Sequence, residues 1–158
     1  MKRIYEFFGR LLFIATLPFI RLMLKRTERV YVCVSCNGEY VLVKNWLARD
    51  TWRLPGGGKR KNETYAQAAV RELQEELGIV VLETDMRCIG KSVATTDRLG
   101  FRYHLFLVSI KQRATVRPST SEITDMKWVK KLPVNHTAEL DTAQQCLDSV
   151  VTSEHGIL

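Results

Sequence analysis

The sequence has few of the features that mark disulfide-rich, fibrous or membrane-spanning proteins. In 158 residues it has four cysteines, nine glycines and four prolines, too few for a disulfide scaffold, a collagen-like repeat or a low-complexity chain. With 46% hydrophobic and 26% charged residues, the chain can bury a core of its own, which excludes an intrinsically disordered protein. Its length fits one domain with a short extension.

Two of the cysteines, Cys33 and Cys36, form a C-x-x-C pair inside an apolar run that predicts a strand. Three positions apart on a strand, their side chains point to opposite faces of the sheet. No second pair of cysteines stands at the spacing of a zinc site. We therefore expect ordinary buried thiols, a reducing compartment and a cytoplasmic protein.

Positive charge is concentrated at the N-terminus. Residues 1–29 carry seven basic and two acidic residues, a net +5 of the formal +7 of the whole chain. The nearly balanced remainder argues against a nucleic-acid-binding surface spread over the whole domain. The distribution favours a local basic element that meets something anionic.

Residues 1–28 form a hydrophobic, basic segment for which two interpretations stay open. The apolar run from Leu11 to Ile20 is too short to cross a hydrocarbon core of about 30 Å as a helix. Pro18 would kink a helix here, and no small-residue cleavage site follows. The segment is predicted either to lie on an anionic membrane surface, as a peripheral helix at the inner face of the membrane, or to pack on the domain core or on the partner in a homodimer.

The remaining residues, 29–158, have the pattern of a single α+β domain. Strands are predicted over residues 30–35, 40–44, 79–82, 88–95, 101–110 and 125–129, with an Asn37-Gly38 hairpin turn after the first. Helices are predicted from Thr64 to Leu77, ended by Gly78, and over residues 136–151. Mixed strands with two core helices indicate an α/β/α sandwich.

The helix predicted from Thr64 to Leu77 carries an acidic cluster. Glu72, Glu75 and Glu76 share one face, where like charges repel by roughly 0.2–0.5 kcal/mol per pair. A divalent cation between the carboxylates would turn this repulsion into coordination, whereas the alternative is a solvated acidic face. The apolar residues expected to be buried on the opposite side are Ala66, Val70, Leu73 and Leu77.

Three neighbouring features favour metal binding over a solvated face. The glycines from Gly56 to Gly58 precede the helix and allow the backbone to come close to a ligand. Glu63 follows this loop, and Arg71 adjoins the first carboxylate of the cluster. Carboxylates, a cation and nearby basic groups suit the attack of water on phosphorus.

The residues from Gly57 to Ile79 resemble the Nudix box. The pattern Gly57-x5-Glu63-x7-Arg71-Glu72-Leu73-x-Glu75-Glu76-x-Gly78-Ile79 agrees at every defining position, and the preceding Leu54-Pro55-Gly56 resembles the usual run-in. The resemblance implies a Nudix-type α/β/α sandwich with a mixed sheet over residues 29–152, and residues 1–28 lie outside it. The one departure is Asn62, where the family commonly has glycine.

The resemblance also implies an activity and a set of site residues. Nudix enzymes hydrolyse a pyrophosphate bond in a nucleoside diphosphate linked to another moiety, with Mg²⁺ or Mn²⁺ as cofactor. The implied metal ligands are Glu72, Glu75, Glu76 and the carbonyl of Gly56, and Glu72 is the leading candidate to activate water. Catalytic support is expected from Arg71, Glu63 and Gly57. A further metal ligand from a later loop is expected to be Glu122, with Asp125 and Glu139 as weaker candidates.

Basic residues near the glycine loop are expected to bind substrate phosphates: Lys59, Arg53 and Lys44. Trp46 and Trp52 flank the same region and are expected either to stack on a base or to pack. Residues 93–99 lack the proline or tyrosine found there in family members that prefer ADP-ribose or dinucleoside polyphosphates, which disfavours these substrates. The expected substrate is therefore a nucleoside triphosphate or a nucleotide-linked metabolite.

Two other functions stay open. One is removal of pyrophosphate from the 5′ end of RNA, which would make a nucleic acid the substrate. The other belongs to a different class, in which the protein senses a nucleotide or docks on a membrane without catalysis. The complete set of box glutamates argues against this second alternative.

Overall fold

A computed structural model describes residues 28–45, 51–96, 99–113, 123–133 and 137–155. The hydrophobic, basic segment predicted at the N-terminus lies outside the described residues except for Glu28, and so do Trp46 and Glu122. Among the helices of the described ranges, none combines the length and hydrophobicity that a membrane crossing requires.

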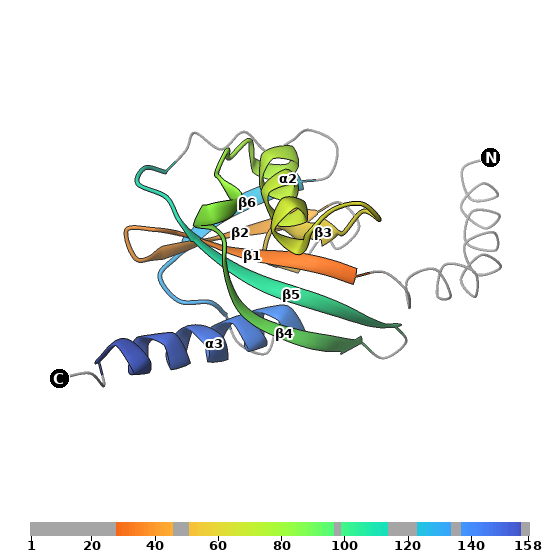
Figure 1. Cartoon of the computed structure of the whole chain (residues 1–158). Helices are drawn as coiled ribbons and strands as arrows, with labels where there is room; N and C mark the ends of the chain where they lie inside the picture. Colours follow the sequence, from red (N-terminus) through yellow and green to blue (C-terminus); the bar gives the residue numbers. More distant parts are fainter. Residues whose placement is uncertain (1–27, 46–50, 97–98, 114–122, 134–136, 156–158) are drawn as a thin grey trace, which may run out of the picture.

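The described residues form a six-stranded mixed sheet (Figure 1). Its strands are β1 (Glu28–Cys36), β2 (Glu39–Asn45), β3 (Gly56–Gly58), β4 (Arg87–Thr96), β5 (Leu99–Ser109) and β6 (Ile123–Val129). The strand order is β4-β5-β1-β2-β6, and β3 pairs with β1. β1 and β5 are parallel, whereas the other pairs are antiparallel.

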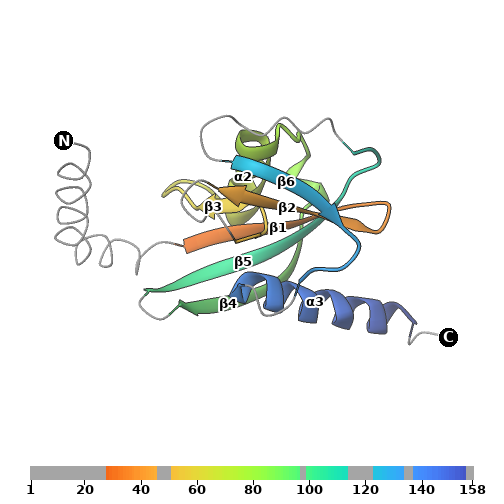
Figure 2. The same ribbon diagram turned by 180° about the vertical axis from the view of Figure 1, so that it is seen from behind.

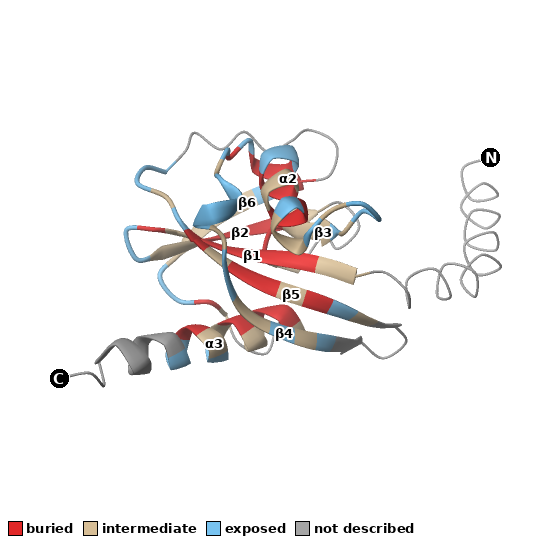
Figure 3. Ribbon diagram, in the orientation of Figure 1, coloured by how far each residue is buried: buried red, intermediate tan, exposed pale blue. Residues whose placement is uncertain are grey.

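One long helix covers each face of the sheet: α2 (Tyr65–Leu77) lies on one side and α3 (Ala138–His155) on the other (Figures 1 and 2). Alternate side chains of β1 supply both cores, because successive residues of a strand point to opposite faces. Val30 and Val32 pack with Leu73 of α2, whereas Tyr31 packs with Leu140 of α3. Figure 3 shows this buried stretch of β1 between the helices. The mixed sheet between two helical layers confirms the predicted fold class.

The cysteine pair is part of the hydrophobic core. Cys33 and Cys36 are both buried and form no disulfide. Burial raises the pKa of the Cys33 thiol to about 12, so this thiol stays protonated and unreactive at neutral pH. These observations agree with the expectation of ordinary buried thiols.

Local sequence signals fix the hairpin and both ends of α2. Asn37 and Gly38 have φ angles of 51° and 76°, as a two-residue hairpin turn of type I′ requires. At the start of α2, the Thr64 hydroxyl accepts from the Gln67 N–H at 3.1 Å, and the Gln67 side chain accepts from the Thr64 N–H at 3.0 Å. This is the capping box of a helix N-terminus. Gly78 ends the helix with φ 65°.

The strand predicted over residues 79–82 is wrong. Ile79 is tied to the end of α2, because its N–H donates to the Leu73 carbonyl at 3.2 Å, and the chain then enters the short 3₁₀ helix η2 (Glu83–Asp85). The side chains of Val80 and Leu82 are 76% and 67% exposed. The apolar run therefore anchors the helix end through Ile79 and joins no strand of the described sheet.

Strand β3 was not predicted, because three successive glycines have little strand propensity. Its pairing with β1 depends on close backbone approach: a Cβ on Gly56 would overlap the Val30 carbonyl oxygen and lie 2.9 Å from the Tyr31 Cα. Gly56 also has φ 145°, a conformation that side chains disfavour. The pairing places the glycine loop beside α2.

Candidate active site

Two of the three clustered carboxylates are buried. Glu72 is 8% and Glu76 9% exposed, whereas Glu75 is exposed. Leu73 and Leu77 are buried as expected, but the core-facing side of α2 also includes Ala68 and Ala69. Ala66 and Val70, which were expected to be buried, are only partly so. Glu72 and Glu76 thus lie at the margin of the core and do not form a solvated acidic face.

The glycine loop packs directly against these two carboxylates. The Gly56 N–H donates to Glu76 Oε2 at 2.8 Å. A Cβ on Gly57 would lie 2.5 Å from Glu72 Oε1 and 2.7 Å from its Oε2. Gly57 therefore leaves both Glu72 oxygens accessible from the loop side, in a space that any larger residue would fill.

A single guanidinium, that of Arg71, links the loop to the carboxylates. Its Nε and Nη2 donate to the two oxygens of Glu63 at 2.5 and 3.0 Å, and Nη1 donates to Glu72 at 2.7 Å and Glu75 at 2.9 Å. Nη2 also donates to the Gly58 carbonyl at 2.9 Å. The bonds to Glu63, above all, raise the pKa of Arg71 beyond its usual value. Arg71 is therefore permanently charged and orients Glu72 by a charge-assisted hydrogen bond.

The Glu63–Arg71 pair predicts a specific pH dependence of stability. The Arg71 bonds lower the pKa of Glu63 from 4.5 to about 2. Because the folded-state pKa is depressed, the stabilisation is complete above pH 4.5 and is lost progressively as the pH falls through about 2. We expect the difference in melting temperature between wild type and Glu63→Gln to shrink over that interval. A difference that stays constant from about pH 6 to about pH 2 would contradict this assignment.

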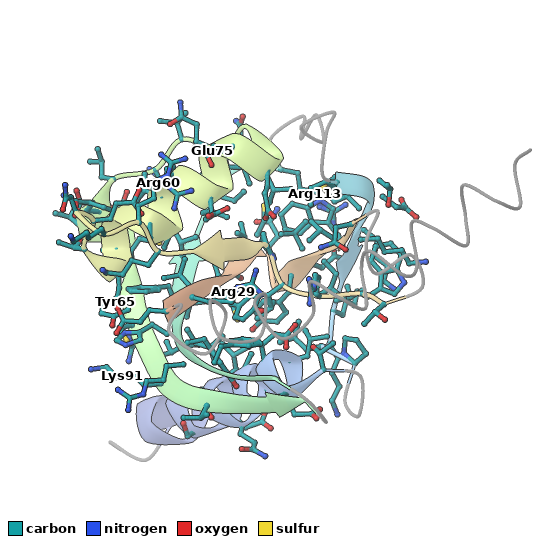
Figure 4. The ribbon with its side chains drawn as sticks, turned by 90° about the vertical axis from the view of Figure 1, so that its right-hand side faces the viewer. Arg29, Arg60, Tyr65, Glu75, Lys91 and Arg113 are labelled. Carbon is teal, nitrogen blue, oxygen red and sulfur yellow. The ribbon has the colours of Figure 1, made fainter. Side chains whose placement is uncertain are left out.

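The carboxylates open into a hollow of about 470 Å³. The glycine loop and the glutamates Glu72, Glu75 and Glu76 line it, and four arginines contribute positive charge: Arg29, Arg53, Arg60 and Arg71. Figure 4 shows Arg29, Arg60 and Glu75 on this side of the molecule; Arg60 donates to Glu75 at 3.0 Å. Ligand pockets of roughly 300–1,000 Å³ accept molecules of nucleotide size.

A family model described as the NUDIX domain matches residues 25–145. The chain belongs to the Nudix family. It is therefore a Nudix pyrophosphohydrolase, and the segment from Gly57 to Ile79 is its Nudix box. The match covers the described sheet, α2 and the first part of α3.

One relative and two solved structures illustrate what this chain is similar to in sequence and in fold. The chain is 29% identical over 108 residues to the phosphatase NudJ of Escherichia coli K12, and the aligned residues make up 68% of this chain and 70% of that protein. A MutT NUDIX hydrolase from Burkholderia pseudomallei superposes with a TM-score of 0.66 at 19% identity, over 77% of this chain and 97% of that one. A bifunctional NMN adenylyltransferase/ADP ribose pyrophosphatase from Francisella tularensis, complexed with AMP and a manganese ion, superposes at 0.60 and 24% identity, over 89% of this chain and 46% of that one.

The basic residues expected near the Nudix box have different surroundings. Arg53 lines the hollow. The Lys59 Nζ lies instead 3.7 Å from a Glu28 oxygen and 5.3 Å from the centre of the Tyr65 ring. The Lys44 Nζ lies 4.7 Å from the centre of the Trp52 ring. The hollow thus brings together Arg53 and the box, but not Lys59 or Lys44.

Two lysine side chains make cation–π contacts with the Trp52 ring. Besides Lys44, the Lys127 Nζ lies 4.2 Å from the centre of this ring, and the ring packs against the core on the α3 side of the sheet. Cation–π contacts and packing account for this tryptophan. Base stacking on Trp52 has no support in this arrangement.

Sequence reasoning missed three residues of the hollow: Arg29, Tyr31 and Asn45. Arg29 was counted with the basic N-terminal segment, although it precedes the lining residue Tyr31 by two positions on β1 and so shares its face of the sheet. That alternation was the available signal. Asn45 ends β2, and nothing in the sequence around it distinguishes it from other polar strand ends.

The later carboxylates fall in three different places. Glu122 lies outside the described residues. Asp125 is exposed on β6, where its side chain accepts from the Met126 N–H at 2.8 Å, and it does not line the hollow. Glu139, in the first turn of α3, is 4% exposed and faces Arg53.

The Nudix box residues fit a hard divalent cation in their chemistry. Mg²⁺ and Mn²⁺ prefer oxygen ligands, and the site offers the buried carboxylates of Glu72 and Glu76 next to the backbone of Gly56 and Gly57. Within the described part of the chain no three acidic, histidine or cysteine side chains already converge as ligands, since Glu75 turns outward to Arg60 and Arg71. The space kept open beside Glu72 by Gly57 is where a cation would fit.

Proposed function

We propose that this Nudix enzyme hydrolyses a pyrophosphate bond in a nucleoside diphosphate linked to another moiety, with Mg²⁺ or Mn²⁺ as cofactor. One observation carries the proposal: the buried carboxylates of Glu72 and Glu76 lie in the same hollow as Arg29 and Arg53. The arginines can offset the negative charge of substrate phosphates, and a carboxylate beside them can accept a proton during the reaction.

Each group has a role in this proposal. Glu72, Glu76 and the Gly56 carbonyl would hold the cation, and Glu75 would join them by leaving its ion pairs with Arg60 and Arg71. The cation would neutralise phosphate charge and make water more acidic. Glu72 accepts the proton of the attacking water. Arg71 keeps Glu72 in position through the 2.7 Å hydrogen bond, and Glu63 in turn orients Arg71.

Two basic residues of the hollow are suited to bind the phosphates on the two sides of a pyrophosphate bond. Arg29 and Arg53 face the hollow from β1 and from the segment before the glycine loop. Their positive charges would offset the phosphates on both sides of the bond that is cleaved. With its volume of about 470 Å³, the hollow fits a nucleoside triphosphate or a nucleotide-linked metabolite.

A hydrolysis screen tests the proposal. Wild type, Glu76→Gln and the control Glu83→Gln, an exposed glutamate on η2, are incubated with Mg²⁺ and nucleoside triphosphates, nucleotide sugars, ADP-ribose, dinucleoside polyphosphates or triphosphorylated RNA. We expect wild type and Glu83→Gln to cleave one small-nucleotide class and Glu76→Gln to lose that activity. Cleavage of the triphosphorylated RNA alone would show that the substrate is RNA and not a small nucleotide. Equal activity of all three proteins would contradict the assignment of Glu76 to the active site.

A further inference from the structure

Behind the hollow, near the start of α3, four buried polar atoms have no hydrogen-bond partner within the described residues. These atoms, all inaccessible to solvent, are the Tyr31 hydroxyl, Arg53 Nε, Thr137 Oγ1 and Glu139 Oε1. The first two belong to residues that line the hollow. Glu139 as a whole is only 4% exposed. An ionised carboxylate is costly to bury unless a positive charge lies near it, so this position of Glu139 needs an explanation.

Arg53 is the positive charge that Glu139 faces. Arg53 Nε lies 4.0 Å from Glu139 Oε1, across 86 residues of chain (53 to 139). Both backbone groups of Arg53 bond to Val43, at 3.0 and 2.9 Å, so its main chain is held on β2. The side chain lines the hollow and stays 26% exposed. Arg53 thus reaches from a fixed backbone, past a buried carboxylate, into the hollow.

The other arginines of the hollow are engaged differently. Arg71 bonds to Glu63, Glu72 and Glu75, and Arg60 bonds to Glu75. The Arg29 guanidinium lies 5.2 Å from the centre of the Phe101 ring. Arg53 combines a buried carboxylate behind it with an Nε that has no hydrogen-bond partner among the described residues.

We propose that Glu139 is a positioning residue that holds the Arg53 guanidinium for binding a substrate phosphate. The planar guanidinium has donors on two edges, so the Nε side can face Glu139 while the terminal nitrogens donate a bidentate pair to phosphate oxygens. The ligand class is a diphosphate, and in this respect the inference rests on the proposed function. Glu139 acts through Arg53 and touches neither the cation nor the reacting phosphorus.

Coupling between the two side chains is the decisive property. The probe is methylenediphosphonate, a pyrophosphate analogue that cannot be hydrolysed, titrated calorimetrically in the presence of Mg²⁺. We expect Glu139→Gln to weaken binding about tenfold, as for loss of a charged partner, and Arg53→Gln to weaken it at least as much. The double variant is expected to bind no more weakly than Arg53→Gln alone, because Glu139 then has nothing to position.

A kinetic readout separates positioning from general stability. With the substrate that the screen identifies, Glu139→Gln is expected to raise KM about tenfold while kcat changes less than about threefold, since the contact is made in ground state and transition state alike. Asp141→Asn, in the same first turn of α3, is the matched control and should shift KM by less than about twofold. If Glu139 had a purely structural role, Glu139→Gln would lower Tm without the selective rise in KM relative to kcat.

The inference is overturned if Glu139→Gln binds the analogue as wild type does, if the two losses add in the double variant, or if wild type does not bind the analogue. Should Glu139→Gln fail to fold, Glu139→Asp serves instead, because it keeps the charge but shortens the side chain. Glu139→Asp is then expected to weaken analogue binding when Arg53 is intact and to have no further effect when it is combined with Arg53→Gln. Weaker binding only in the combination with Arg53→Gln would overturn the inference. Analogue binding needs no turnover, so absence of activity on every substrate would refute the proposed function without touching this coupling.

Discussion

Glutamine in place of Glu72 is expected to lower kcat by about 10³-fold, the effect of losing a general base together with a cation ligand, while the protein remains folded. Glu72 is 8% exposed and bonds Arg71 at 2.7 Å. An amide keeps the shape of the side chain and an acceptor for Arg71, but it cannot take a proton from water and binds a divalent cation poorly. The measurement is kcat at saturating Mg²⁺, with Tm recorded for the same samples.

Glu83→Gln is the matched control for this experiment. Glu83 is an exposed glutamate whose side chain accepts a long hydrogen bond of 3.5 Å from the Thr64 hydroxyl. It does not line the hollow. We expect its kcat to stay within about twofold of wild type. If Glu72→Gln kept a tenth or more of wild-type kcat, about 1.4 kcal/mol or less in barrier, Glu72 would not be the residue that activates water.

Alanine at Gly57 is expected to lower activity by about 10²-fold, the typical cost of moving a reacting group by about 1 Å. The added Cβ would lie 2.5 Å from Glu72 Oε1 and 2.6 Å from its Cδ, which is closer than real contacts allow. Glu72 has to move, and its hydrogen bond to Arg71 breaks or lengthens. Because a side chain gives way here and not the backbone, we expect Tm to change little, in contrast to the activity.

Gly58→Ala is the neighbouring control. A Cβ at Gly58 meets nothing within 4 Å, so this variant is expected to retain activity within about fivefold of wild type. Comparison of kcat and Tm for both alanine variants separates displacement of Glu72 from a general effect on the loop. Equal activities of Gly57→Ala and Gly58→Ala would show that the position of the Glu72 carboxylate does not limit the reaction.

Features encoded in consecutive residues could be predicted from the sequence. The limits of α2 follow from Thr64 and Gly78, and the hairpin follows from Asn37-Gly38, because capping and turn formation depend on a few neighbouring residues. The Nudix box likewise lies within one short segment, from Gly57 to Ile79. The family, the fold class and the acidic cluster of the box could therefore be predicted from the sequence.

Features that depend on contacts between distant segments could not be predicted. Lys59 and Arg60 look equivalent in the sequence, but Lys59 pairs with Glu28 on β1 while Arg60 enters the hollow. Likewise the sequence made Glu139 a weaker candidate metal ligand, but it gave no sign that Glu139 lies 4.0 Å from Arg53. Neither partner is visible to periodicity or spacing, which report only local structure.

The most direct test of the account is Mn²⁺ binding measured by electron paramagnetic resonance, since it requires no knowledge of the substrate. The account predicts that wild type and Glu83→Gln bind Mn²⁺ equally and that Glu72→Gln and Glu76→Gln each lose at least about tenfold in affinity. Equal Mn²⁺ binding by all four proteins would contradict the central claim that the carboxylates beside the glycine loop hold the catalytic cation.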